Sequence, residues 1–198
     1  MKLGLFALTA ALAASPFAAA QSSSDKPAQQ RATPPSQQPA PDPFAGVPAA
    51  KPDDVKSVDS LLAALYDVIS GPAGERDWNR FRSLFMPNAR LTSAEKAPDG
   101  LIHVRPSSVE DYVRLGGSYF LKNGFFEKPI VSRVQTFGNV AQIFSSYESR
   151  HALGEAPFAR GINSLQMLYD GKRWWVVNIL WDEERPDNPL PKEFANKP

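Results

Sequence analysis

The sequence predicts an α+β fold in which a curved, mostly antiparallel sheet is wrapped around about three N-terminal helices. Residues 161–181 have the pattern of one long β-hairpin, with β-branched and aromatic residues on both sides of Asp170-Gly171. Residues 130–137 and 140–153 form a second predicted hairpin around Gly138-Asn139. Helical patterns come earlier in the chain, so the helices are expected to cover one face of the sheet and to leave a hollow between the two layers.

The helices are predicted from apolar residues that recur at the 3.6-residue helical period. Each segment also has a capping or terminating signal, because Ser accepts hydrogen bonds from free amides at a helix start and Gly or Pro ends a helix. The predicted helices are 58–69 after Ser57 and before Gly71-Pro72, about 77–85 before Pro87, and a third that opens with Ser107 and Glu110 and stops at Gly124. Short strands are expected at 89–93 and 101–105, around a turn at 98–100.

Residues 1–20 have the pattern of a secretory signal peptide. Lys2 precedes an apolar run, and Ala18-Ala19-Ala20 provides an A-x-A cleavage site. We therefore expect an exported protein that is periplasmic or secreted. The apolar run is shorter than the roughly 20 residues of a membrane-spanning helix, and no span is expected elsewhere in the chain.

Composition divides the rest of the chain into three parts. Residues 21–54 are rich in Pro, Gln and Ala and hold few large apolar side chains, which predicts a disordered tether. Residues 55–185 are expected to form one domain with one core, and residues 186–198 a flexible tail. The chain has 22 Lys and Arg against 21 Asp and Glu, a balance that favours no nucleic-acid partner. It has no Cys, which excludes disulfides and a thiol nucleophile.

Three stretches carry a resemblance to a known superfamily: Asp77-Trp78-Asn79-Arg80-Phe81-Arg82-Ser83-Leu84-Phe85, Met86-Pro87-Asn88-Ala89-Arg90-Leu91 and Tyr169-Asp170-Gly171-Lys172-Arg173-Trp174-Trp175-Val176-Val177. Together they resemble the nuclear transport factor 2-like superfamily, also called SnoaL-like, over residues 55–185. The resemblance implies a cone-shaped α+β fold, which hosts isomerases, dehydratases, epoxide hydrolases, cyclases and proteins with no reaction. The steroid-isomerase branch has a carboxylate base soon after the helix-to-strand joint, but the matching position here is Ser93, and Glu95 comes two residues farther on.

The candidate ligand pocket follows from the register of the two hairpins. A two-residue turn at Gly138-Asn139 places Tyr147 and His151 on the mostly apolar face, which we take as the concave one, unless a β-bulge inverts the faces. The same construction around Asp170-Gly171 pairs Asn163 with Asn178. Because buried amides need hydrogen-bond partners, these two side chains are expected either to satisfy each other or to contact a ligand.

Other polar side chains are candidates for proton transfer or ligand contact. His103 and His151 are the histidines of the chain, and their ordinary pKa suits acid–base catalysis near neutral pH. Tyr119, like Tyr147 and Tyr66, could donate a hydrogen bond to a ligand. Arg90 is expected to pair either with an acidic ligand or with a carboxylate such as Asp77 or Glu148.

The sequence lacks the patterns of several reaction types. Neither histidine has the neighbouring ligands of a metal motif, so no metal and no other cofactor are expected. A nucleophile elbow and a phosphate-binding loop are also missing from the sequence. The leading hypothesis is an exported, soluble domain that binds a small, largely apolar molecule without catalysis. The alternatives are a cofactor-independent lyase, isomerase or cyclase, and an interaction module that forms a homodimer.

Overall fold

The computed structural model describes residues 42–195. The predicted signal peptide (1–20), most of the predicted tether (21–41) and residues 196–198 lie outside the described residues. The helices are α1 (Pro52–Val55), α2 (Val58–Ile69), α3 (Trp78–Ser83), α4 (Val109–Phe120) and α5 (Lys192–Ala195). The strands are β1 (Phe85–Lys96), β2 (Ile102–Ser108), β3 (Phe126–Phe137), β4 (Val140–Arg150), β5 (Ala159–Tyr169) and β6 (Trp174–Glu183).

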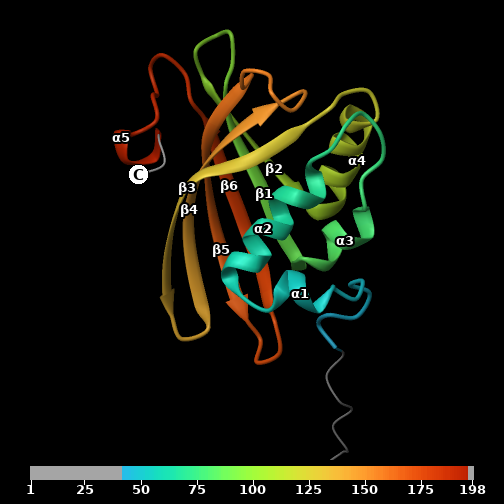
Figure 1. The fold of residues 1–198 in the computed structure, drawn as a ribbon. Helices are drawn as coiled ribbons and strands as arrows, with labels where there is room; N and C mark the ends of the chain where they lie inside the picture. The colour runs from blue at the N-terminus through green and yellow to red at the C-terminus, as the bar shows by residue number, and fades with distance from the viewer. Residues whose placement is uncertain (1–41, 196–198) are drawn as a thin grey trace, which may run out of the picture. The chain divides into compact units, whose positions relative to one another are not determined.

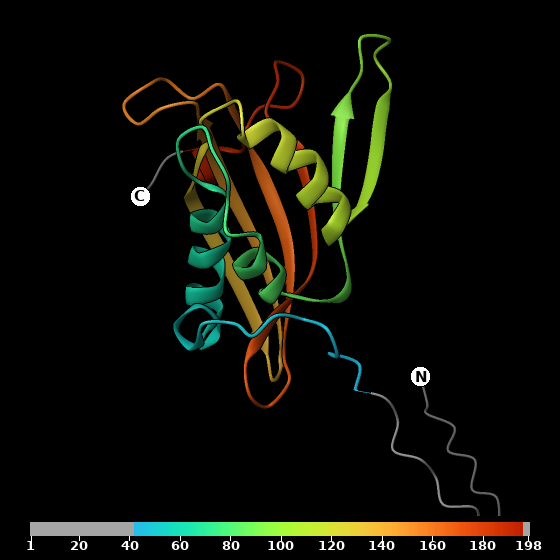
Figure 2. The same cartoon turned by 90° about the vertical axis from the view of Figure 1, so that its right-hand side faces the viewer.

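The strands form one six-stranded sheet in the order β2-β1-β6-β5-β4-β3. The neighbours β1 and β6 are parallel, and the other neighbouring pairs are antiparallel. Helices α2, α3 and α4 lie on one face of this curved sheet (Figure 1), and the hairpin of β1 and β2 extends past the helices (Figure 2). The predicted α+β fold, with a mostly antiparallel sheet around about three helices, is confirmed. No helix between residues 42 and 195 has the length and apolar composition needed to cross a bilayer.

The helix starts are determined by local side-chain hydrogen bonds. Ser57 caps α2 as predicted, because its hydroxyl accepts a hydrogen bond from the amide of Ser60 at 3.1 Å. The cap of α4 is Ser108, one residue later than predicted, and it forms a reciprocal capping box with Asp111. The neighbouring Ser107 stays in β2, where it pairs with β1.

A β-bulge in β3 changes which side chains face the helices. From the Gly138-Asn139 turn to Ser132, β3 and β4 pair in the register predicted from the sequence. The register then shifts, so that Glu127 lies opposite Ser149. Because successive side chains alternate between the two faces of a strand, the extra residue turns Glu127 toward the helices in place of its neighbour.

The hairpin of β5 and β6 differs from its predicted register. Its turn spans residues 170–173, where Asp170 accepts hydrogen bonds from the amides of Lys172 and Arg173 at 2.7 and 2.8 Å. Farther along, Val176 and Asn178 have consecutive partners in β5, so β6 carries an extra residue between them. The prediction of a two-residue turn was wrong because the Asp170 side chain stabilises a longer loop.

The longer turn and the bulge in β6 together separate the two asparagines that were predicted to pair. Asn163 lies opposite Trp181, and Asn178 lies opposite Gln166 on the outer face of the sheet. Beyond the bulge, side chains of odd-numbered residues such as Trp181 and Glu183 face the helices. Two bulges therefore each bring a glutamate to the inner face, Glu127 in β3 and Glu183 in β6.

The packed part of the chain begins before residue 55, the boundary predicted from composition. The ring of Phe44 stacks on the indole of Trp175, with centroids 4.7 Å apart, and leaves that indole 5% exposed. Asp54 accepts a hydrogen bond from Arg80 at 2.7 Å. Phe44 was the one aromatic side chain in the predicted tether, and burial of its ring offsets the entropy lost on ordering the segment.

The C-terminal residues also pack on the domain, contrary to the predicted flexible tail. Phe194 in α5 is 8% exposed, and its ring contacts that of Phe144 on the outer face of the sheet. The Ser146 hydroxyl donates to the carbonyl of Phe194 at 2.7 Å, and Arg160 donates to the carbonyl of Ala195 at 2.8 Å. One aromatic anchor and two hydrogen bonds thus order residues that look polar in the sequence.

Candidate functional site

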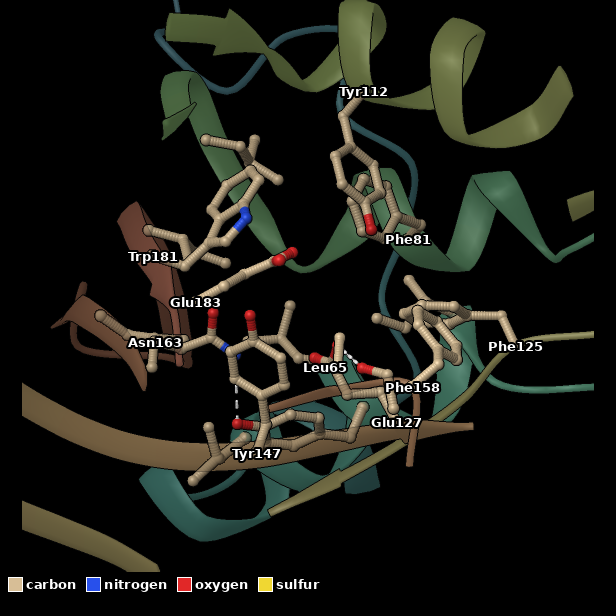
Figure 3. Close-up of a pocket in the computed structure, with 18 residues that line it drawn as sticks. Leu65, Phe81, Tyr112, Phe125, Glu127, Tyr147, Phe158, Asn163, Trp181 and Glu183 are labelled. Carbon is tan, nitrogen blue, oxygen red and sulfur yellow. Dashed lines mark hydrogen bonds between the residues drawn. The ribbon is translucent and has the colours of Figure 1, made fainter. Parts of the chain in front are cut away.

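A cavity of about 210 Å³ lies between the helices and the inner face of the sheet. Figure 3 shows the side chains that surround it, and they come from the helices as well as from the strands. Most of the lining is apolar or aromatic. The residues are Leu62, Leu65, Tyr66, Ile69, Phe81, Leu91, Tyr112, Phe125, Glu127, Tyr147, Ser149, Phe158, Ala159, Asn163, Leu165, Ile179, Trp181 and Glu183.

Glu127 is the carboxyl group in the interior of this cavity. Its Oε2 accepts a hydrogen bond from the hydroxyl of Ser149 at 2.8 Å. Burial raises the pKa of Glu127 to about 7, the nearby Ser149 hydroxyl and Asn163 amide act in the opposite direction, and the charge of Glu183 raises it further. Glu127 can therefore be either a hydrogen-bond donor or an anion near neutral pH.

Glu183 is the second carboxyl group, and it lies at the mouth of the cavity. It is solvent-exposed, and Figure 3 shows its carboxyl pointing into the space between Trp181 and Tyr112. Partial burial raises the pKa of Glu183, as do the neighbouring charges of Glu95 and Asp182. The two glutamates place negative potential both inside the cavity and at its entrance.

A hydroxyl and amide network crosses the cavity wall. The Tyr66 hydroxyl is 2.9 Å from Ser145 Oγ, which is 2.8 Å from Ser132 Oγ. The amide of Asn163 donates to the Tyr66 hydroxyl at 3.3 Å. Burial raises the pKa of Tyr66 to about 12, so this phenol stays neutral and its hydrogen is available for bonding.

Tyr112 and Tyr147 supply two further hydroxyls. The Tyr112 hydroxyl points from α4 into the cavity (Figure 3), and burial followed by the charge of Glu127 raises its pKa. Burial also raises the pKa of Tyr147, which is 4% exposed. Its hydroxyl lies against Gly161, where an added Cβ would come within 2.6 Å of it. The packing of Tyr147 thus depends on a glycine in the neighbouring strand.

The structure brings two of the predicted pocket residues together. Tyr147 and Asn163 both line the cavity, and the position of Tyr147 agrees with the face assigned from the Gly138-Asn139 turn. They come from neighbouring strands, β4 and β5, which pair without a register shift. The bulge that was considered between residues 140 and 147 lies instead in β3.

The other five candidates lie outside the cavity lining. His151 is exposed at the end of β4 and stacks on Phe158, and His103 is exposed in β2, 3.8 Å from Asp99. Tyr119 is 39% exposed on α4, and Asn178 lies on the outer face of the sheet.

Arg90 was predicted to meet an acidic ligand, Asp77 or Glu148. It is exposed instead and donates to the carbonyls of Asn88 and Ala89. Of the seven predicted pocket residues, Tyr147 and Asn163 therefore line the cavity. The other five do not: Arg90, His103, Tyr119, His151 and Asn178.

The carboxyl groups of the site were not identified from the sequence. Without the bulges, Lys128 and Asp182 would face inward in place of Glu127 and Glu183. Tyr112 was recognised only as part of the apolar stripe of a helix. The one available signal was that the Glu127-Lys128 pair lies between aromatic and apolar residues at the start of a strand.

The position that matches the base of the steroid-isomerase branch, Ser93, does not reach the cavity. Ser93 lies opposite Trp181 in the sheet and is buried, but it is not part of the lining. Among residues 42–195, no group of three or more His, Cys, Asp or Glu side chains has the proximity required to hold a metal ion.

Comparisons with known proteins identify the fold. In sequence, the chain matches no protein-family model and no curated protein. Among solved structures, it is similar to a Nostoc punctiforme protein of unknown function with a cystatin-like fold, at 14% identity and TM-score 0.50, over 68% of this chain and 92% of that one. A Kribbella flavida protein has 13% identity and TM-score 0.50, over 66% and 90% of the two chains.

A third similar structure is a nuclear transport factor 2-like protein of unknown function from Silicibacter pomeroyi. It has 14% identity and TM-score 0.46, over 65% of this chain and 94% of that one. At such identities, structural similarity is evidence for the fold and not for the activity. The strand order and the helix layer agree with the fold that the resemblance implies, and the chain is similar in fold to the cystatin-like protein from Nostoc punctiforme.

Proposed function

We propose that the domain binds a small, largely apolar molecule in the cavity between α2, α4 and the sheet. One observation carries this proposal: an apolar and aromatic cavity of about 210 Å³ has a protonatable carboxyl, Glu127, in its interior. Binding sites for small molecules are typically apolar hollows with a few fixed polar groups. Because an apolar cavity of about 150 Å³ holds benzene, this one suits a ligand of about 10 non-hydrogen atoms, or part of a longer one.

The polar groups would orient the ligand within the cavity. Glu127, Tyr66 and Tyr112 line the cavity from three different elements, β3, α2 and α4, and each could offer a hydrogen bond to a polar group of a ligand. The apolar remainder of the ligand would contact leucine, isoleucine and aromatic side chains. Such a division of roles favours selection by shape together with one polar contact.

Calorimetric titration with 2-naphthol, a small neutral aromatic probe, tests this proposal. The wild-type domain should bind it, and Ala159→Phe should weaken binding at least tenfold, because the new ring would occupy the cavity. Ala94→Phe is the matched control, since Ala94 is also half-buried but lines a groove on the outer face of the sheet. Equal loss of binding in both variants, or binding that Ala159→Phe leaves unchanged, would place the probe elsewhere and contradict the proposal.

A second candidate function is cofactor-independent proton transfer, as in a lyase, isomerase or cyclase. The observation that favours it is the pKa of Glu127, about 7, since a general acid or base works best when its pKa is near the working pH. The Tyr112 hydroxyl, which also faces the cavity, would stabilise a developing oxyanion. The exposed His103 and His151 do not supply this chemistry in the cavity.

Hydrogen–deuterium exchange at the carbon next to the carbonyl of 2-indanone separates the two candidates. An enzyme of this kind should accelerate the exchange in deuterated water, as followed by NMR, and Glu127→Gln should reduce the acceleration at least 100-fold. The Glu148→Gln variant removes an outward-facing carboxyl paired with Arg150 and should have no effect. Binding without accelerated exchange would leave the domain as a binding module.

An interaction module remains a third proposal. Phe137 is 86% exposed at the β3–β4 turn, and Val140 is 49% exposed beside it. Exposed apolar side chains can mark an interface, but another exposed apolar side chain of β4, Phe144, is partly covered by Phe194. Formation of a homodimer is thus proposed from two exposed side chains, Phe137 and Val140.

Export from the cell is proposed from the signal-peptide pattern of residues 1–20.

A further inference from the structure

We infer that the ligand of this cavity is an organic ammonium ion, whose positive group contacts Glu127 and whose apolar part fills the aromatic enclosure. This inference rests on the proposed function of the cavity as a small-molecule site. It adds the charge of the ligand, which the cavity shape alone does not specify.

The charges around the cavity are all of one sign. Glu127 and Glu183 face it, and within the described part of the chain none of the lining residues is Lys, Arg or His. The nearest lysine in sequence, Lys128, points to the opposite face, where it pairs with Glu148 at 3.1 Å. Among the described residues, the cavity lining thus supplies no counterion to Glu127. A positive charge on the ligand would take that place.

The hydrogen bonds of Glu127 leave capacity for such a cation. A carboxylate has about four acceptor positions, and in the described residues the side-chain hydrogen bond that Glu127 accepts comes from Ser149. Burial of an unpaired carboxylate is unfavourable, because the protein interior solvates charge poorly. Attraction to an ammonium group would offset this penalty and so favour binding of a cation over a neutral molecule of the same shape.

Aromatic rings enclose the same space. The cavity lining includes Tyr66, Phe81, Tyr112, Phe125, Tyr147, Phe158 and Trp181. The face of an aromatic ring carries partial negative charge and attracts cations, and recognition of quaternary ammonium groups by aromatic cages is a common use of this attraction. Rings together with a carboxylate therefore favour an ammonium ion over a neutral or anionic ligand of the same shape.

An anionic ligand fits this arrangement poorly, because both glutamates would repel it and no lining cation would attract it. A neutral ligand that accepts a hydrogen bond could use protonated Glu127 instead. The two possibilities predict opposite effects of pH. A cation requires the carboxylate and binds more tightly as pH rises, whereas a neutral acceptor requires the protonated acid and binds more tightly as pH falls.

Titration calorimetry with benzyltrimethylammonium provides the test, because the charge of this probe does not change with pH. Its carbon isostere, neopentylbenzene, has the same shape without the charge, and phenylacetate supplies the opposite charge. At pH 8 the cation should bind at least tenfold more tightly than either comparison probe. Its affinity should fall at least tenfold between pH 8 and pH 5, as Glu127 gains a proton, while Tyr66, Tyr112 and Tyr147 stay neutral throughout. The raised pKa of Glu183 acts in the same direction.

Three variants separate the charge of the site from its shape. Glu127→Gln should weaken binding of the cation at least tenfold at pH 8 and change binding of neopentylbenzene less than about threefold, which also shows that the variant is folded. Glu148→Gln, a carboxylate on the outer face, should change neither affinity. Glu183→Gln should cause a smaller loss for the cation, because Glu183 is exposed at the mouth.

The outcomes distinguish this inference from the proposed function. If the neutral isostere binds as tightly as the cation at pH 8, or Glu127→Gln leaves the cation affinity unchanged, the ammonium inference is wrong while the cavity remains a binding site. The affinities of these probes and of 2-naphthol are also to be measured in Ala159→Phe. If this substitution weakens the binding of none of them, both the proposed function and the inference are wrong.

Discussion

Glu127→Gln is expected to raise the free energy of unfolding by about 3 kcal/mol at pH 8 and to leave it nearly unchanged at pH 4. Burial raises the pKa of Glu127 to about 7 from its ordinary value of 4.5. Below pH 4.5 the carboxyl is protonated in both the folded and the unfolded chain. Between pH 4.5 and 7 the unfolded chain releases this proton while the folded chain keeps it, so stability falls as pH rises.

The measurement is urea unfolding of the wild type and the variant at several pH values from 4 to 8. The difference between their free energies of unfolding isolates Glu127 from carboxyls whose pKa is lowered, such as Asp54 and Glu110, which affect both proteins equally. Glu148→Gln is the control with the opposite sign, because hydrogen bonding from Arg150 lowers the pKa of Glu148. If the difference in free energy of unfolding between Glu127→Gln and the wild type does not vary with pH, Glu127 is well solvated in the folded protein.

Gly161→Ala is expected to destabilise the domain by about 2–4 kcal/mol. A Cβ at this position would lie 2.4 Å from the carbonyl oxygen of Asp182 and 2.6 Å from the hydroxyl of Tyr147. The first contact involves the backbone of the neighbouring strand and cannot be relieved by a side-chain rotation. The variant should therefore shift β5 against β6 and displace Tyr147 from the cavity wall.

Thermal or urea unfolding measures this effect, and Gly117→Ala is a matched control. An added Cβ at Gly117, inside α4, meets the indole of Trp78 at an ordinary 3.6 Å. This substitution should stabilise the domain by about 0.5–1 kcal/mol, because alanine loses less conformational entropy than glycine in a helix. Equal stability of Gly161→Ala and the wild type would mean that β5 and β6 are farther apart than described.

The elements of the fold were predictable because their signals are local. The 3.6-residue period of α2, its cap at Ser57 and the tight turn at Gly138-Asn139 depend on residues close to one another in the sequence. Hence the α+β class and the inward position of Tyr147 followed from the sequence, whereas Asn163 was placed through a register around Asp170-Gly171 that was wrong. The short helices α1 and α5 were not predicted, since tertiary contacts of Phe44 and Phe194 order the segments around them.

The chemistry of the cavity, in contrast, depends on two bulges without a recognisable signal in the sequence. One extra residue in β3 and one in β6 place Glu127 and Glu183 on the inner face. A bulge forms where strand pairing and packing against helices are best satisfied together, so it is a property of the assembled sheet. Because side chains alternate along a strand, a shift of one residue exchanges the inner and outer sets, and this exchange places two carboxyl groups in an apolar cavity.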